Sequence, residues 1–305
     1  MKTNLYTLFA AQLVAVLLFP ACVLAAPAQE TFATPDDAAS ALVSAVKGDD
    51  IKQMRSVLGH AGGALSSGDP VADRATAKRF VSAYETKHAI VRDGDKAKLT
   101  IGNDDFPFAF PLVKRGDRWR FDTVAGIDEL NARRIGENEL TVIKVLEAIV
   151  DAQRDYAAED RNGDGVVAYA RKFVSGSGKH DGLYWPTKAG EPQSPLGPLV
   201  AGASGDGYRA SKSGPTPFYG YYYRMLKGQA ASGDTPAMDY VVRGRQIGGF
   251  AVIAYPAKYG SSGIMTFIVN QDGKVYQSDL GQKTQERATA IQKFDPGKSW
   301  TPVAP

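Results

Sequence analysis

Three stretches near the start of the chain space their apolar residues as helices do. The first begins at Thr34, a capping residue, which is followed by Pro35 and two aspartates that suit the positive end of a helix. Gly48 ends this helix, Asp49 caps a second short one, and a third is expected at about 70–87. The spacing therefore predicts a helical start to the globular part of the chain.

The pattern then changes from helical to alternating. Strands are expected at 89–92, 96–101, 106–114 and 118–124, separated by glycine turns. The last turn, Arg115-Gly116-Asp117, also spells an integrin-binding tripeptide, but a tight turn between two strands explains all three residues. Helices followed by a small antiparallel meander predict an α+β module over residues 29–130.

The strongest helical pattern of the chain follows Gly136 and predicts a helix over 139–159. After it, residues 175–217 are rich in Gly, Pro and Ser and are expected to form an ordered, turn-dense segment. Further strands are expected at 240–242, 250–255, 265–269 and 275–277, and a last amphipathic helix at 284–293. A long helix on an antiparallel sheet, similar to a pilin head, is thus predicted for 131–305, and the two modules should meet at 126–138.

The amino-terminal segment reads as a removable export signal. A basic start and an apolar run of about 20 residues precede Ala26 and Ala28, small residues that fit cleavage before Gln29. A membrane anchor and a lipid on Cys22 are the alternatives. We expect residues 1–28 to be removed, leaving a periplasmic or secreted protein without a membrane span.

Composition and charge narrow the classes of function. The 305 residues are 44% hydrophobic and 23% charged, which is typical of a globular protein. The formal net charge of +3 and the lack of a long basic run argue against nucleic acid as a partner. Cys22 is the only cysteine, so the mature chain is expected to have no disulfide, thiol nucleophile or thiolate metal site.

One short motif has the spacing of a calcium loop. Its oxygen ligands and sharp turn would come from Asp160, Asn162, Asp164, Gly165 and Val166, the last through its carbonyl. Arg171 occupies the twelfth position, where such loops have a glutamate, so calcium would need a further carboxylate such as Asp155 or Glu159. The alternative is a helix-ending turn whose polar side chains cap backbone amides. No other cofactor is expected.

A dense supply of aromatic side chains offers a candidate binding surface. Its members are Trp185, Tyr219, Tyr221, Tyr222 and Tyr223. Aromatic faces stack on sugars and peptide groups at interfaces. The alternative is that these side chains pack the turn-dense segment onto the sheet.

Catalytic motifs are not evident in the sequence. The three histidines, His60, His88 and His180, occur in separate contexts, without a His-Glu-x-x-His or Gly-x-Ser-x-Gly pattern. The segment 175–180 resembles a phosphate-binding loop, but it lacks the glycine that opens this motif and the Ser or Thr that ends it. No catalytic residue is assigned, and we lean against an enzyme.

Several longer phrases resemble an uncharacterised bacterial family catalogued as domain of unknown function 2950. They are RRIGENEL at 133–140, DGLYWP at 181–186, SPLGP at 194–198, GYYYR at 220–224, GGFA at 248–251 and DLG at 279–281. The resemblance spans the mature chain and implies an exported protein of unassigned activity. We therefore expect a periplasmic binding or scaffolding protein whose partner is an envelope component or polymer. The alternative is an envelope hydrolase with a site that the sequence does not reveal.

Overall fold

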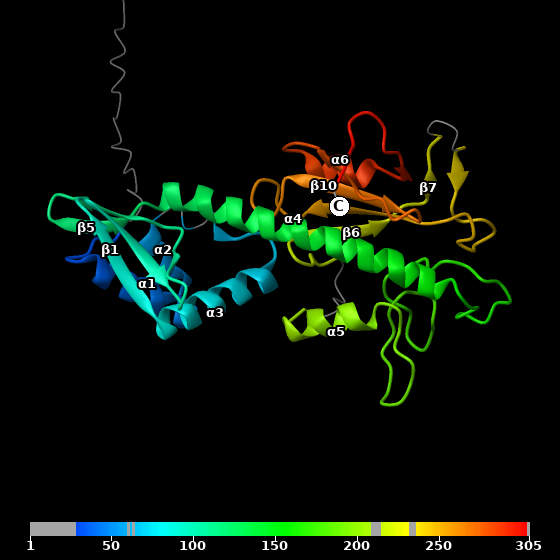
Figure 1. Cartoon of the computed structure of the whole chain (residues 1–305), viewed down its shortest axis with the longest axis horizontal. Helices are drawn as coiled ribbons and strands as arrows, with labels where there is room; N and C mark the ends of the chain where they lie inside the picture. Colours follow the sequence, from blue (N-terminus) through cyan, green and yellow to red (C-terminus); the bar gives the residue numbers. More distant parts are fainter. Residues whose placement is uncertain (1–28, 60–61, 63–64, 209–214, 232–235, 304–305) are drawn as a thin grey trace, which may run out of the picture.

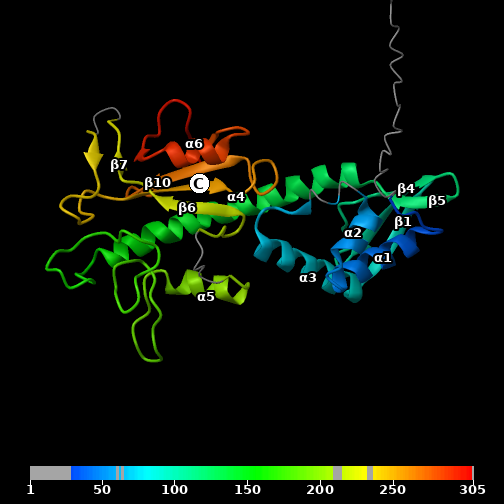
Figure 2. The same ribbon diagram turned by 180° about the vertical axis from the view of Figure 1, so that it is seen from behind.

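A computed structural model describes residues 29–59, 62, 65–208, 215–231 and 236–303 of the chain. The expected signal segment 1–28, with Cys22, and His60 lie outside the described residues. Figure 1 shows two bodies of helices and sheets joined by one long helix, and Figure 2 shows the same arrangement from behind. The predicted α+β class is confirmed.

Three helices open the first body: α1 (Pro35–Lys47), α2 (Ile51–Leu58) and α3 (Pro70–Thr86). The expected cap at Thr34 is present as a reciprocal pair, because the Thr34 hydroxyl accepts from the Asp37 N–H while the Asp37 carboxylate accepts from the Thr34 N–H. The predicted cap of α2 is wrong by one residue. Asp50 caps this helix, and Asp49 adopts a left-handed φ of 50° in the turn before it.

A twisted antiparallel sheet completes the first body. Its strands are β1 (His88–Asp93), β2 (Lys96–Ile101), β3 (Phe106–Pro107), β4 (Leu112–Arg115) and β5 (Arg118–Phe121). The order is β1-β2-β4-β5, with β3 also paired to β2. The single strand predicted at 106–114 is wrong, because it is split into β3 and β4 around Pro111, which has no N–H for a ladder. The sheet packs on α1 and α2 through Leu42, Val57 and Phe121.

One helix, α4 (Thr123–Tyr156), belongs to both bodies. Its 34 residues span about 50 Å at ~1.5 Å per residue. The helix predicted over 139–159 is therefore too short at its start, because Asp122 caps an earlier beginning and Ile127 and Leu130 pack into the first core. Further along, Leu146 is fully buried in the second core.

The boundary expected at 126–138 falls within α4. In the described part of the chain, no strand of the first sheet pairs with a strand of the second. The division into separate modules at residue 130 stays a prediction, since the helix continues through it. Within the same described ranges, none of the helices, α4 included, is both long and apolar enough to cross a bilayer.

The second body is built on a sheet with the order β13-β11-β10-β9-β6. Its strands are β6 (Tyr221–Met225), β9 (Ala251–Pro256), β10 (Met265–Asn270), β11 (Tyr276–Asp279) and β13 (Thr301–Pro302). Side chains alternate between its faces: Val252 and Phe267 meet α4, whereas Ile253 and Ile268 meet the last helix, α6 (Thr284–Ala290). The predicted long helix on an antiparallel sheet is confirmed, and α6 covers the opposite face (Figure 1).

Several elements of the second body differ from the sequence prediction. The strand expected at 240–242 is wrong, because the pairing residues belong to β8 (Met238–Asp239), which forms a separate sheet with β7 (Gly228–Gln229) and β12 (Lys293–Phe294). The helix expected at 284–293 stops at α6, since Ile291 is already extended and leads into β12. A short helix, α5 (Gly197–Gly205), lies within the turn-dense segment, with Leu199 and Val200 packed on the second core.

Candidate functional site

The five aromatic candidates do not share one surface. Tyr221 is fully buried beneath α4, and its hydroxyl donates to the Met265 carbonyl at 3.0 Å. Tyr222 lies on the other face of β6, where its ring centroid is 5.6 Å from that of Tyr255. Trp185, also largely buried, stacks on the imidazole of His180 at 4.3 Å. These placements favour the alternative interpretation, in which the rings pack the core.

Tyr223 packs against the same core as Tyr221. Tyr219 lies next to Tyr208, with ring centroids 5.4 Å apart, and Tyr208 bonds a buried carboxylate that the sequence did not single out. Asp69 is fully buried; its Oδ1 caps α3, while its Oδ2 accepts from the Tyr208 hydroxyl at 2.8 Å and from the Gly220 N–H at 2.9 Å. The Tyr219 hydroxyl donates to Asp206 Oδ2 at 2.5 Å. Burial, followed by this bond, raises the pKa of Tyr219 to about 12. We call Asp69, Tyr208 and Gly220 the junction cluster, because they tie α3 to the second body.

The calcium-like loop already has partners for its oxygens. Asp160 accepts from the N–H groups of Gly163, Asp164 and Gly165, and Asn162 accepts from the Asp164 N–H. Asp164 Oδ2 accepts from Arg245 Nε at 3.0 Å, and this hydrogen bond lowers the pKa of the Asp164 carboxyl. Val166 donates its N–H to Asp164 Oδ1 at 3.0 Å.

The carboxylates that could complete a calcium shell are also engaged. Asp155 and Glu159 both lie within 3.0 Å of the guanidinium of Arg161. Among the residues that the structure describes, no group of three or more His, Cys, Asp or Glu side chains is placed to hold a metal. The polar side chains of the loop thus accept from backbone N–H groups, as the alternative of a capped turn predicts, and a calcium site stays a prediction.

We expect millimolar calcium to leave the melting temperature unchanged relative to chelator. To bind, the ion would have to break the ion pair of Arg245 with Asp164 and one of the ion pairs that Arg161 forms with Asp155 and Glu159. Calcium would raise the melting temperature only if its binding to the native state outweighed the loss of these ion pairs. Thermal unfolding of the mature chain checks this. A rise that disappears in the double variant Asp160→Ala, Asp164→Ala would establish the calcium site instead. Arg245→Ala is the informative control, since it frees the Asp164 carboxylate.

A polar cleft of about 270 Å³ is lined by Tyr156, the last residue of α4, by loop residues that follow this helix, and by 244–246 from the loop that precedes β9. Its position is fixed by buried contacts: both side-chain groups of Gln153 bond the backbone of Ala170, and the Tyr169 N–H donates to the Gln246 carbonyl at 3.0 Å. Arg171 and Arg245, which follow Ala170 and precede Gln246 in the sequence, also line the cleft.

The lining of this cleft is mostly charged or amide-bearing. Lys172 Nζ lies 2.6 Å from Asp181 Oδ2, and this bond, with the Gly176 N–H, lowers the pKa of the Asp181 carboxyl. Asn162, from the calcium-like loop, also lines the cleft. Sequence reasoning missed this site, because its residues are separated along the chain and form no motif.

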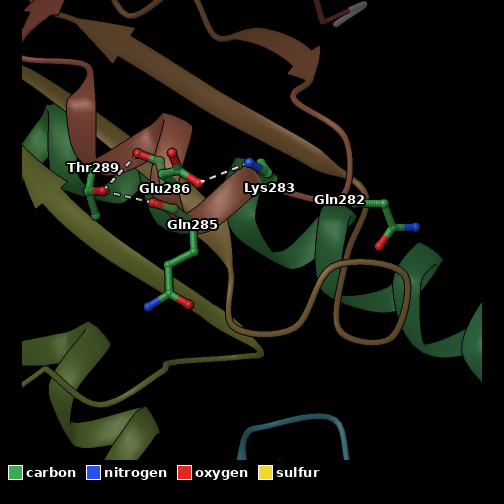
Figure 3. Close-up of a pocket in the computed structure, with 5 residues that line it drawn as sticks. All are labelled: Gln282, Lys283, Gln285, Glu286 and Thr289. Atoms are coloured by element: carbon green, nitrogen blue, oxygen red, sulfur yellow. Dashed lines mark hydrogen bonds and ion pairs between the residues drawn. The ribbon is translucent and has the colours of Figure 1, made fainter. Parts of the chain in front are cut away.

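A larger depression, of about 480 Å³, lies over α6 (Figure 3). Its lining side chains are exposed, and the bonds they form stay within the helix: Lys283 Nζ is 3.9 Å from Glu286, and the Thr289 hydroxyl donates to the Gln285 carbonyl. Such a set is the solvated side of a short helix. The cleft beyond α4 is therefore the stronger candidate.

Comparison with known proteins agrees with the resemblance found in the sequence. The family described as a protein of unknown function (DUF2950) matches residues 29–303. No curated protein and no solved structure matches the chain.

Proposed function

Because the chain belongs to the DUF2950 family, whose activity is unassigned, we propose a function from its own structure: an exported binding protein of the bacterial cell envelope. Its ligand is a small polar molecule bound in the cleft beyond α4. The convergence of polar side chains from three separate segments of the chain carries this proposal. Export is supported by the basic start, the apolar run and the small residues before Gln29.

Binding is favoured over the alternative of hydrolysis. Glycosidases use two carboxylates about 5–9.5 Å apart across the scissile bond. Asp181 is the one carboxylate among the described residues that line the cleft, and it is held by Lys172. The hydroxyl of Tyr156 donates to the His180 carbonyl at 2.6 Å, and His180 is not among the described residues that line the cleft, so this lining offers no imidazole base.

The test is to block the cleft without changing its charge. Ala168 lines the cleft, and Ala168→Trp should fill it. The mature protein is purified from the periplasm of a host that expresses the full chain, so that recovery there, with Gln29 as first residue, also tests export. Melting temperatures are then measured with glucose, N-acetylglucosamine, glucuronate, glutamate and glucose 6-phosphate.

At least one of these compounds should raise the melting temperature by several degrees at about 100 times its Kd. The rise should vanish in Ala168→Trp and persist in Ala189→Trp, a matched change on an exposed turn. The proposal is wrong if no compound of the panel shifts the melting temperature, or if the shift survives in Ala168→Trp.

A further inference from the structure

The cleft contains a hydrogen-bond donor with no partner. Gln246 is only 3% exposed, yet its side-chain NH₂ bonds to no other residue in the described part of the chain. A buried donor without an acceptor destabilises the protein, because it has lost its bonds to water and gained none in return. Gln246 lines the cleft, and its backbone bridge to Tyr169 fixes the position of its main chain there. An acceptor atom of a ligand would relieve that cost.

The charges of the wall show what kind of acceptor fits. Lys172 and Arg245 are neutralised by Asp181 and Asp164, at 2.6 Å and 3.0 Å. Arg171 donates to the Gly244 carbonyl at 2.9 Å and forms no ion pair with a described carboxylate. Among the described charged residues that line the cleft, Arg171 is thus the one cation without a carboxylate partner, and it favours a ligand with a single negative charge.

Asp181 sets a further condition on the ligand. Its carboxylate is kept ionised by Lys172, and it can still accept from a ligand hydroxyl through its remaining lone pairs. A dianion such as a phosphate ester would carry more negative charge than the one unpaired cation of the lining, Arg171, can balance. The volume of about 270 Å³ lies just below the ~300–1,000 Å³ of typical small-molecule sites, so the bound group is about the size of one sugar ring.

We propose that the cleft binds the carboxylate of a hydroxylated organic acid of sugar size. The Arg171 guanidinium and the Gln246 amide donate to the carboxylate oxygens, and Asp181 accepts from a hydroxyl. This inference rests on the proposed binding function and adds the chemical class of its ligand.

Isothermal titration of the mature protein with three matched probes tests this class. Glucuronate carries the carboxylate, glucose replaces it with a neutral hydroxymethyl group, and glucose 6-phosphate carries a dianion. Glucuronate should bind at least about tenfold more tightly than either, because charge-assisted hydrogen bonds are about twice as strong as neutral ones. Its affinity should fall as salt is added.

Three variants locate the interaction. Arg171→Gln and Gln246→Leu should each weaken glucuronate binding about tenfold or more. Gln246→Leu should leave the melting temperature of the free protein unchanged or higher, because it removes an unsatisfied buried donor. Arg243→Gln makes the same charge change at an exposed position outside the lining and should leave the affinity as it is.

The possible failures separate the two proposals. If glucose or glucose 6-phosphate binds as tightly as glucuronate, or if glucuronate does not bind, the carboxylate class is wrong. Binding of another panel compound that Ala168→Trp abolishes would leave the binding function standing in that case. Glucuronate binding that both Arg171→Gln and Gln246→Leu leave unaltered would overturn the assignment of these two residues.

Discussion

Replacement of Asp69 by alanine is expected to lower the free energy of unfolding by about 3–5 kcal/mol. Loss of the cap on α3 costs about 1 kcal/mol. The larger part comes from the other carboxylate oxygen, because the buried Gly220 N–H and the half-buried Tyr208 hydroxyl both lose this acceptor. Each buried donor that loses its acceptor lowers the free energy of unfolding by about 1–3 kcal/mol.

Asp50→Ala provides the matched control. Asp50 caps α2 with the same pair of bonds that Asp69 makes to α3, but it is exposed and has no partner in the second body among the described residues. Its replacement should cost only about 1 kcal/mol. Urea unfolding of both variants, followed by circular dichroism, gives the comparison. If Asp69→Ala and Asp50→Ala lowered the free energy of unfolding equally, the junction cluster would not couple α3 to the second body.

The two roles of Asp69 differ in how far they can be predicted from the sequence. An aspartate directly before a proline and an apolar run marks a helix start, so the cap on α3 is readable locally. The junction cluster is not, since Tyr208 and Gly220 lie 139 and 151 residues further along the chain. Pairings over such separations depend on how the two bodies meet, and no local pattern encodes that.

The same distinction explains what the sequence predicted of the second body. Alternation and apolar runs located β9 and β10, whose pairing keeps both faces of the sheet buried. β6 was missed, because its consecutive tyrosines look like a recognition surface, although Tyr221 and Tyr222 merely occupy opposite faces of one strand. Gln246, which carries the ligand inference, has no motif at all and becomes visible only through its burial.

The early start of α4 is the largest difference between the predicted and the observed fold, and two of its glycines test it. Both Gly126 and Gly136 look like helix breakers in the sequence, because glycine inside a helix costs about 1 kcal/mol relative to alanine. In the structure only Gly126 has a packing reason. A Cβ atom there would lie 2.2 Å from Phe110 Cδ1 and 2.8 Å from Phe110 Cα, whereas nothing lies within 4 Å of one at Gly136.

Gly126→Ala is therefore expected to destabilise the protein by about 2 kcal/mol, while Gly136→Ala stabilises it by about 0.5–1 kcal/mol. The sign differs because Phe110 is 3% exposed and contacts the helix through its backbone as well as its ring, so a rotamer change alone does not make room. Urea unfolding of the two variants measures both effects in one helix, with the same chemical change. If Gly126→Ala were as stabilising as Gly136→Ala, the first turns of α4 would not pack against Phe110.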